Sequence, residues 1–286
     1  MANTLLTPQI IANEALMVLR NNAVMANLVH RDYSDEFVGG VGDTITIRKP
    51  ATFEAKEYSS TITVQDATES SITVKMDKHL DVSFAVSSKQ MSMDIKDFSS
   101  QLLVPAMQAF QDKIDSYILA LASSLTNKVT ASGDAKTDII DARKFLTANA
   151  APLTERRYVY GSATEADLLK TDLFISAEKV GDAGTALREA SLGRKFGLDF
   201  YADQNVDKVS KLGGVAFHKN AFALVTRPLA LPQGAANAAI VNYDGFGLRV
   251  VYGYDMNAKT DTISIDMLCG VKTLDAKLAA AIVSAT

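Results

Sequence analysis

The sequence is poor in the residues that build covalent and metal-based sites. Its 286 residues include one cysteine, three histidines and no tryptophan. A single thiol excludes a disulfide within the chain and a cysteine-based zinc cluster. Cys269 lies in the apolar run IDMLCG, where a buried thiol behaves as a small hydrophobic residue. His30, His79 and His218 have no second histidine at ligand spacing, so we expect structural or exposed roles for all three.

Long hydrophobic runs and a basic excess are also missing. No run reaches the ~18 apolar residues of a transmembrane helix. The N-terminal stretch MANTLLTPQIIANEALMVL lacks the basic start of a secretory signal, so we expect folding in a cytoplasm. The formal net charge of −4 disfavours avid nucleic-acid binding through phosphates. A hydrophobic fraction of 48% nevertheless suffices for a sizeable core.

Motifs of catalysis and nucleotide binding are absent as well. The chain has no G-x-S-x-G elbow, and the glycine-containing segment 181–197 lacks the G-K-S/T ending of a phosphate loop, which favours a mobile loop over 177–196. Asp112 and Asp115 could bind a cation, but with Lys113 between them a solvated helix face is the expected role. No catalytic, cofactor-binding or metal-binding residue is predicted, and an enzyme is not expected.

What the sequence does contain is a long, polar-tipped β-arm. Residues 43–50 and 72–86 alternate apolar and polar side chains, and the charged, Ser/Thr-rich segment 51–71 connects them. A two-stranded ribbon alone is marginal in water, so its apolar face needs a neighbour, which in a multimer can be another copy. The mixed charges of Glu54, Lys56 and Glu57 suit either salt bridges across an interface or a soluble exposed edge.

Helices and further strands surround this arm in an α+β order. One helix is predicted over 8–29, with Thr7 as N-cap. Another is predicted over 94–121, where Asp94 can cap and Pro105 implies either a kink or two abutting helices. A capping box, Ser162-Ala163-Thr164-Glu165, starts a helix that runs through Leu169. The remaining predictions are a helix near 137–149 and strands at 156–161, 197–202, 214–218, 248–255, 261–270 and the alanine-rich C-terminal end. Residues 221–231 are predicted as either another strand or a helix-to-strand element.

Several of these segments, taken in order, carry a family resemblance. They are TPQIIANEALMVLRNN, VGDTITIRKP, HLDVSFAVSSKQMSMDIKDFSSQLLVPAMQAFQDKIDSYILALA, RYVYGSATEADLL, GVAFHKNAFALVTRPL and GLRVVYGYDMNAKTDTISIDMLCGVKTLDAKLAAAIV. The last is the most specific. Together they resemble a tailed-phage major capsid (coat) protein with the Hong Kong 97-type shell fold.

The resemblance implies a division of the chain and a set of contacts. The implied parts are an N-terminal arm and helix (1–42), an extended β-loop (43–90), a spine helix and peripheral domain that shares part of the C-terminal strands (91–155), an axial domain (156–245) and closing strands (246–286). The implied intersubunit contacts of the extended loop are Phe53, Glu54, Lys56, Glu57 and Tyr58. The implied contacts of the axial loop are Arg188, Arg194 and Lys195.

The function implied is self-assembly into pentamers and hexamers of an icosahedral phage head around double-stranded DNA. The DNA would be contacted weakly and without sequence specificity. Expected partners are other copies of the chain, a separate scaffolding protein, a portal and decoration proteins, with no membrane and no cofactor. The protein is expected in the virion after assembly in the host cytoplasm. The alternatives are an encapsulin-like nanocompartment shell, another phage structural component, and an enzyme of unrecognised family.

Overall fold

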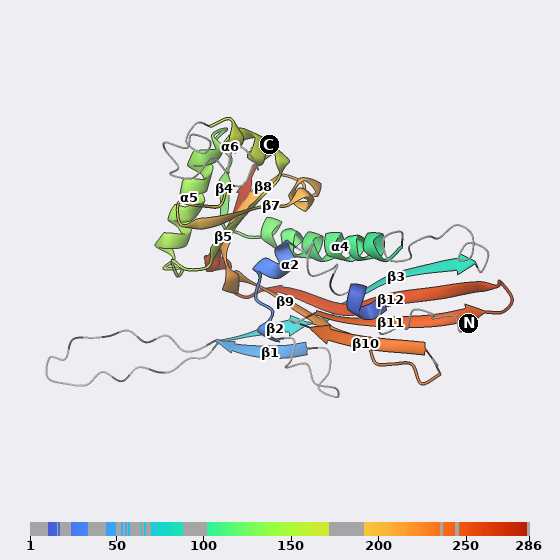
Figure 1. Ribbon diagram of the computed structural model, residues 1–286. Coiled ribbons are helices and arrows are strands. Elements are labelled where there is room, and N and C mark those ends of the chain that lie inside the picture. Colours follow the sequence, from blue (N-terminus) through green and yellow to red (C-terminus); the bar gives the residue numbers. More distant parts are fainter. Residues whose placement is uncertain are drawn as a thin grey trace.

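The computed structural model describes residues 11–15, 17, 24–33, 44–49, 53, 55, 57, 64, 66, 70–87, 102–171, 192–234, 237–243 and 246–284. Among these residues the strands form three sheets, and helices pack on two of them (Figure 1). The predicted α+β class is therefore confirmed.

A five-stranded antiparallel sheet is organised around one long strand, β12. The first part of β12 pairs with β11 and its last part pairs with β9, while β3 runs along its other edge. The predicted hairpin of β11 and β12 is confirmed, and Ile263, Ile265 and Met267 are buried at alternate positions as expected for a sheet with one core face. The strands are β3 (Lys78–Ser87), β9 (Phe222–Arg227), β10 (Asn237–Tyr243), β11 (Phe246–Asp255) and β12 (Thr260–Thr273).

A six-stranded mixed sheet forms the second half of the body, in the order β4-β13-β8-β5-β7-β6. Its central strands are buried on both faces. In β5, Tyr158 and Tyr160 pack in the core cluster that contains α5, and Val159 packs in the other cluster. The elements are β4 (Lys128–Thr130), α5 (Ala135–Ala148), β5 (Arg156–Tyr160), α6 (Ser162–Leu169), β6 (Arg194–Lys195), β7 (Leu198–Ala202), β8 (Leu212–His218) and β13 (Ala279–Val283), with short 3₁₀ turns η3 (Gln204–Lys208), η4 (Lys219–Ala221) and η5 (Ala276–Leu278).

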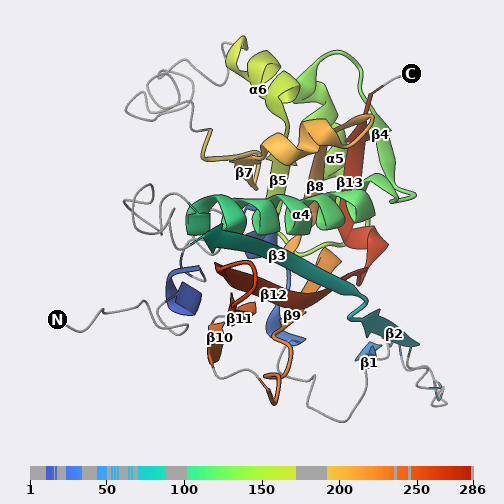
Figure 2. The ribbon, with the colours of Figure 1, turned by 90° about the vertical axis from the view of Figure 1, so that its right-hand side faces the viewer.

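The long helix α4 (Val104–Ser123) crosses the molecule between the two sheets (Figure 2). Phe110, Ile114 and Ile118 are fully buried along one side of it. Pro105 lies in the first turn of α4, where its missing N–H leaves no helical hydrogen bond unmade, so it does not kink the helix interior. Residues 88–101, including the expected cap Asp94, lie outside the described residues.

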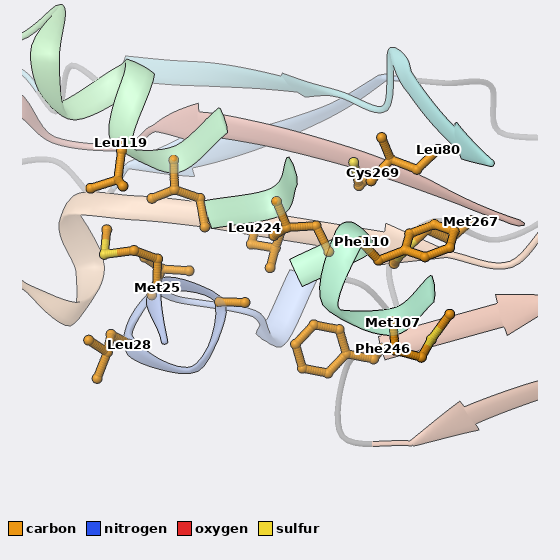
Figure 3. Close-up of a cluster of buried hydrophobic side chains, with 14 of the residues drawn as sticks. Met25, Leu28, Leu80, Met107, Phe110, Leu119, Leu224, Phe246, Met267 and Cys269 are labelled. Atoms are coloured by element: carbon orange, nitrogen blue, oxygen red, sulfur yellow. The ribbon is translucent and has the colours of Figure 1, made fainter. Parts of the chain in front are cut away.

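The main hydrophobic core joins α4, the N-terminal segment and both sheets. The short helix α2 (Met25–Leu28) contributes three side chains to it, those of Met25, Ala26 and Leu28. Figure 3 shows side chains from separate elements converging there: Met25, Leu28, Leu80, Met107, Phe110, Leu119, Leu224, Phe246, Met267 and Cys269. Residues 11–15 and 17 are also helical, so the predicted helix 8–29 is confirmed at these residues and at 25–28, whereas Val24 and Val29 are bends.

Two local predictions are wrong. Ser162 does not cap α6, because the N-cap is Gly161 and the cap is supplied from a distance: the Ser162 amide donates to the Asp207 carboxylate at 3.1 Å. Residues 72–86 do not form one return strand either. The chain divides at Met76–Asp77 into β2 (Ser70–Lys75), which pairs with β1 (Thr44–Lys49), and β3, which joins the five-stranded sheet.

The five parts expected from the resemblance remain predictions. The sheets draw on segments from both sides of those expected boundaries. β9 and β10, from the segment 156–245, share a sheet with β11 and β12, and α5 packs near β13 at the C-terminal end of the chain.

Candidate assembly interface

The root of the predicted arm is a two-stranded antiparallel ribbon in which Ile45 faces Val74 and Ile47 faces Ile72. One face carries these apolar residues and the other carries exposed polar ones. The exposed set comprises Thr44, Thr46, Arg48, Ser71, Thr73 and Lys75. The predicted two-sided ribbon is confirmed over β1 and β2. They lie at the end of the five-stranded sheet opposite the β11–β12 turn (Figure 1).

The apolar face of this root is covered by its own chain. Val74 and Met76 pack with Ala223, Val225 and Leu274 in a separate hydrophobic cluster, against which Tyr33, Ile45 and Ile47 also pack. The ribbon was expected to need a neighbour that covers its apolar face, and at the root this neighbour is the same chain rather than another copy. A buried cluster of this kind stabilises the ribbon where it leaves the body.

One glycine of β12 permits this close packing. A Cβ atom built on Gly270 would lie 3.1 Å from the Cα of Met76 and would overlap the carbonyl group of Lys75. Both are backbone atoms, which cannot swing aside as a side chain can. Gly270 is therefore required for the ribbon root to lie against β12.

The distal part of the arm has a different environment. Phe53 is 66% exposed and Val64 is 85% exposed, and Glu57 is also exposed. The other predicted loop contacts, Glu54, Lys56 and Tyr58, lie outside the described residues. Single exposed apolar side chains also occur elsewhere on the described surface, at Leu153 and Met256, so exposure alone does not mark Phe53 and Val64 as contact residues.

The predicted axial contacts are partly described. Arg194 and Lys195 form β6, which turns through Phe196 and Gly197 into β7 with both turn residues at positive φ. Arg194 Nε lies 3.7 Å from Asp199 Oδ1, and Lys195 Nζ donates to the Leu192 carbonyl oxygen at 2.6 Å. The expected mobile loop over 177–196 is thus wrong for β6, while Arg188 lies outside the described residues.

The surroundings of Cys269 and of the three histidines indicate the role of each of these titratable residues. Burial raises the pKa of the Cys269 thiol to about 12, which agrees with an inert core residue. His218 is buried, its Nδ1 accepts from the Asn220 amide, and burial lowers its pKa. Burial also lowers the pKa of His30, whose ring stacks on Tyr33, whereas His79 is exposed.

Of the two carboxylates on α4, Asp112 is solvated as predicted and Asp115 is not. Asp112 is on the surface and forms an ion pair with Lys208 at 2.9 Å. Asp115 is completely buried, and its carboxylate accepts hydrogen bonds from the amides of Ala26 at 3.1 Å and Val24 at 3.4 Å. The prediction of a solvated face is wrong for Asp115. Its hydrogen-bond partners are backbone amides that lie 89 and 91 positions away in the sequence, so no local sequence pattern indicates them.

Within the described part of the chain, no group of three or more His, Cys, Asp or Glu residues is arranged to hold a metal ion. Within the same residues, no helix is long and apolar enough to cross a membrane. The features that stand out are instead a ribbon with a covered root and exposed distal side chains, and a long helix joining two sheets.

Similar proteins are found through structure. No protein-family model and no curated protein matches the sequence. A solved structure from Mycobacterium phage Che8 is 19% identical, with a TM-score of 0.72 over 91% of each chain. The capsid structure of the cyanophage P-SCSP1u is 14% identical, with a TM-score of 0.66 over 92% of this chain and 88% of that one. The chain has a phage capsid fold of the Hong Kong 97 type.

A virus-like particle has a similar fold as well. The virus-like particle from Pyrococcus furiosus is 11% identical, with a TM-score of 0.57 over 96% of this chain and 98% of that one. In this chain the long helix crosses between the two large sheets, and the ribbon of β1 and β2 lies at one end of the five-stranded sheet (Figure 1).

Proposed function

We propose that the chain is a major capsid protein that self-assembles into pentamers and hexamers of an icosahedral phage head enclosing double-stranded DNA. The observation that carries this proposal is the structural match to phage structures, including a capsid, over about nine-tenths of this chain and of the matched chains. The proposed role is structural rather than enzymatic.

The proposed contacts between subunits lie along the distal arm. Phe53, Glu54, Lys56, Glu57 and Tyr58 would lie on a neighbouring copy. The exposure of Phe53 supports this, because an apolar ring in water gains free energy when a partner covers it. Arg188, Arg194 and Lys195 would face the centre of each pentamer or hexamer. Arg194 keeps more than half of its side chain exposed beside Asp199, which leaves it accessible to an acidic neighbour.

Other partners follow from the same role. A separate scaffolding protein, a portal and decoration proteins would act during or after assembly in the host cytoplasm, and the finished protein would reside in the virion. The net charge of −4 suits weak, sequence-independent contact with packaged DNA, which must be moved into the head and released from it.

A second candidate is an encapsulin-like nanocompartment shell that encloses protein cargo. The match to the Pyrococcus furiosus virus-like particle, which covers almost the whole of both chains, supports this second candidate. The two candidates share a closed shell and differ in what the shell contains.

Negative-stain electron microscopy of the purified chain, alone and co-expressed with its genomic neighbours, tests the proposal. Closed particles tens of nanometres across are expected. Nuclease-protected DNA inside them supports the phage head, and a co-purifying enzyme without DNA supports the nanocompartment. A uniformly small species in both preparations would contradict both candidates, and tubes or small rings would point to another phage component.

A further inference from the structure

A short N-terminal segment, residues 24–33, is fastened to several parts of the body, and we call it the tie segment. At the beginning of α2, the amides of Ala26 and Val24 donate to the carboxylate of Asp115, which comes from α4. At the end of α2, Arg157 Nη1 from β5 donates to the Leu28 carbonyl oxygen. A carboxylate at the amino end and a guanidinium at the carboxyl end both match the orphan groups of a helix. The tie segment thereby links the long helix to the six-stranded sheet.

The tie segment is also joined to the five-stranded sheet. His30 donates its amide to the Phe222 carbonyl at 3.0 Å, and the Leu224 amide donates back to the His30 carbonyl at 2.9 Å. The guanidinium of Arg31 lies 4.8 Å from the centre of the Phe246 ring. One segment of ten residues therefore contacts the long helix and both large sheets, so any change in its docking alters how these parts are held together.

The charges around Asp115 do not neutralise it. Asp203, the N-cap of η3, is only 5% exposed, and its negative charge acts on Asp115. Its Oδ1 accepts from the Asn205 amide at 2.8 Å, whereas its Oδ2 is buried without a hydrogen-bond partner among the described residues. Neither carboxyl has an ion pair with a described residue. Lys208, the cation that acts on Asp203, is bound to Asp112, whose charge adds to the repulsion.

We propose that Asp115 and Asp203 form a proton-operated clasp that holds the tie segment when the pair carries a proton and loosens it when both carboxyls are ionised. Two buried carboxylates that act on each other and have no ion pair with a described residue repel each other when both are ionised, and protonation of one of them removes that repulsion. The clasp belongs to the single subunit, so it does not depend on whether the chain forms a phage head or a nanocompartment.

The direction of the effect follows from proton linkage. Burial, followed by the charge of Asp203, raises the pKa of Asp115 to about 7, although the amides of the tie segment oppose this. If the tie segment leaves, water reaches Asp115 and its pKa falls toward its ordinary value. The docked state therefore binds the proton more tightly, and docking weakens as the pH rises through about 7. A single group with this shift increases the opening constant about tenfold between pH ~6 and ~8.

Amide hydrogen exchange on the full chain measures this opening directly. The expected result is that protection of the Val24, Met25 and Ala26 amides falls about tenfold from pH ~6 to ~8, after correction for intrinsic exchange. Amides in the middle of α5 serve as the internal reference and keep their protection. Unchanged protection in the tie segment over this pH range would overturn the proposal.

Two variants assign the effect to the clasp. Asp115→Asn removes the titrating group at nearly constant size and is expected to abolish the pH dependence. Its matched control, Asp167→Asn, removes an exposed carboxylate of α6 that pairs with Lys170. This control is expected to keep the pH dependence. A wild-type slope in Asp115→Asn would contradict the clasp. If Asp115→Asn does not fold, Asp203→Asn decides, because it keeps every amide bond to Asp115 and must move the midpoint to lower pH. An unmoved midpoint would also overturn the proposal.

Discussion

The root and the distal part of the ribbon lie in one stretch of chain but meet opposite environments. At the root, Val74 is fully buried in a cluster made by the same chain. Farther out, Phe53 and Val64 keep most of their surface exposed. The root is therefore part of the folded subunit, whereas the distal arm leaves apolar side chains exposed and is proposed above as the contact with another copy. Substitutions at the root should change stability, and substitutions in the distal arm should change assembly.

Gly270→Ala should give the largest effect on folding. Its new Cβ would overlap backbone atoms at Lys75 and Met76, so either β12 or the ribbon must shift. We expect a loss of about 3 kcal/mol in the free energy of unfolding, measured by urea denaturation. The matched control is Gly253→Ala in the neighbouring strand β11, where a Cβ meets nothing within 4 Å, and its effect should stay within ~0.5 kcal/mol. Equal effects of the two substitutions would show that the close approach at Gly270 is not a stabilising feature.

Val74→Ala should have the next largest effect. The substitution removes two methyl groups from a fully buried position, and the cluster around it is small. We expect a loss of about 2 kcal/mol by the same urea measurement. Thr73→Ala, on the exposed face of the same strand, is the control and should change stability by no more than ~0.5 kcal/mol. A Val74→Ala chain as stable as the control would mean that the root is not held by this cluster.

Phe53→Ser should leave folding almost unchanged and weaken assembly. The ring is exposed in the subunit, so the free energy of unfolding should move by less than ~0.5 kcal/mol. If a neighbour covers the ring, each contact loses about 1–2 kcal/mol, and the concentration needed for assembly rises about tenfold. Light scattering against concentration gives this value. Leu153→Ser, an equally exposed apolar residue between α5 and β5, is the control and should assemble as the wild type does.

Local patterns in the sequence predicted much of the fold. Alternation in ITVKM and DTISIDML predicted strands correctly, because apolar residues such as Val74, Ile263 and Ile265 are buried at alternate positions. LRVVYGYD was correctly predicted as the first strand of the hairpin. The helix over 137–149 was predicted within two residues of α5. β10 was missed because the run AAIV has no alternation, and the three-residue strand β4 is too short to give a pattern.

Features that depend on distant partners could not be predicted. Ser162 and Glu165 have the spacing of a capping box, but the Ser162 amide donates to the Asp207 carboxylate instead. Gly161 has no side chain, which leaves room for this carboxylate beside the amide. The spacing of Asp112 and Asp115 indicates only that they share a helix face. The burial of Asp115 depends on residues 24–26 folding back onto α4. Gly270 likewise looks like an ordinary strand glycine until the ribbon root lies against it.

Replacing residues 52–68 by a short glycine-serine linker tests the division between root and distal arm most directly. The replacement leaves β1, β2 and their cluster intact. Electron microscopy of this chain beside the wild type, under the conditions in which the wild type forms closed particles, is the decisive measurement. The predicted result is a soluble subunit of wild-type stability that forms no closed particles. Normal closed particles from the shortened chain would contradict the assignment of the distal arm to assembly.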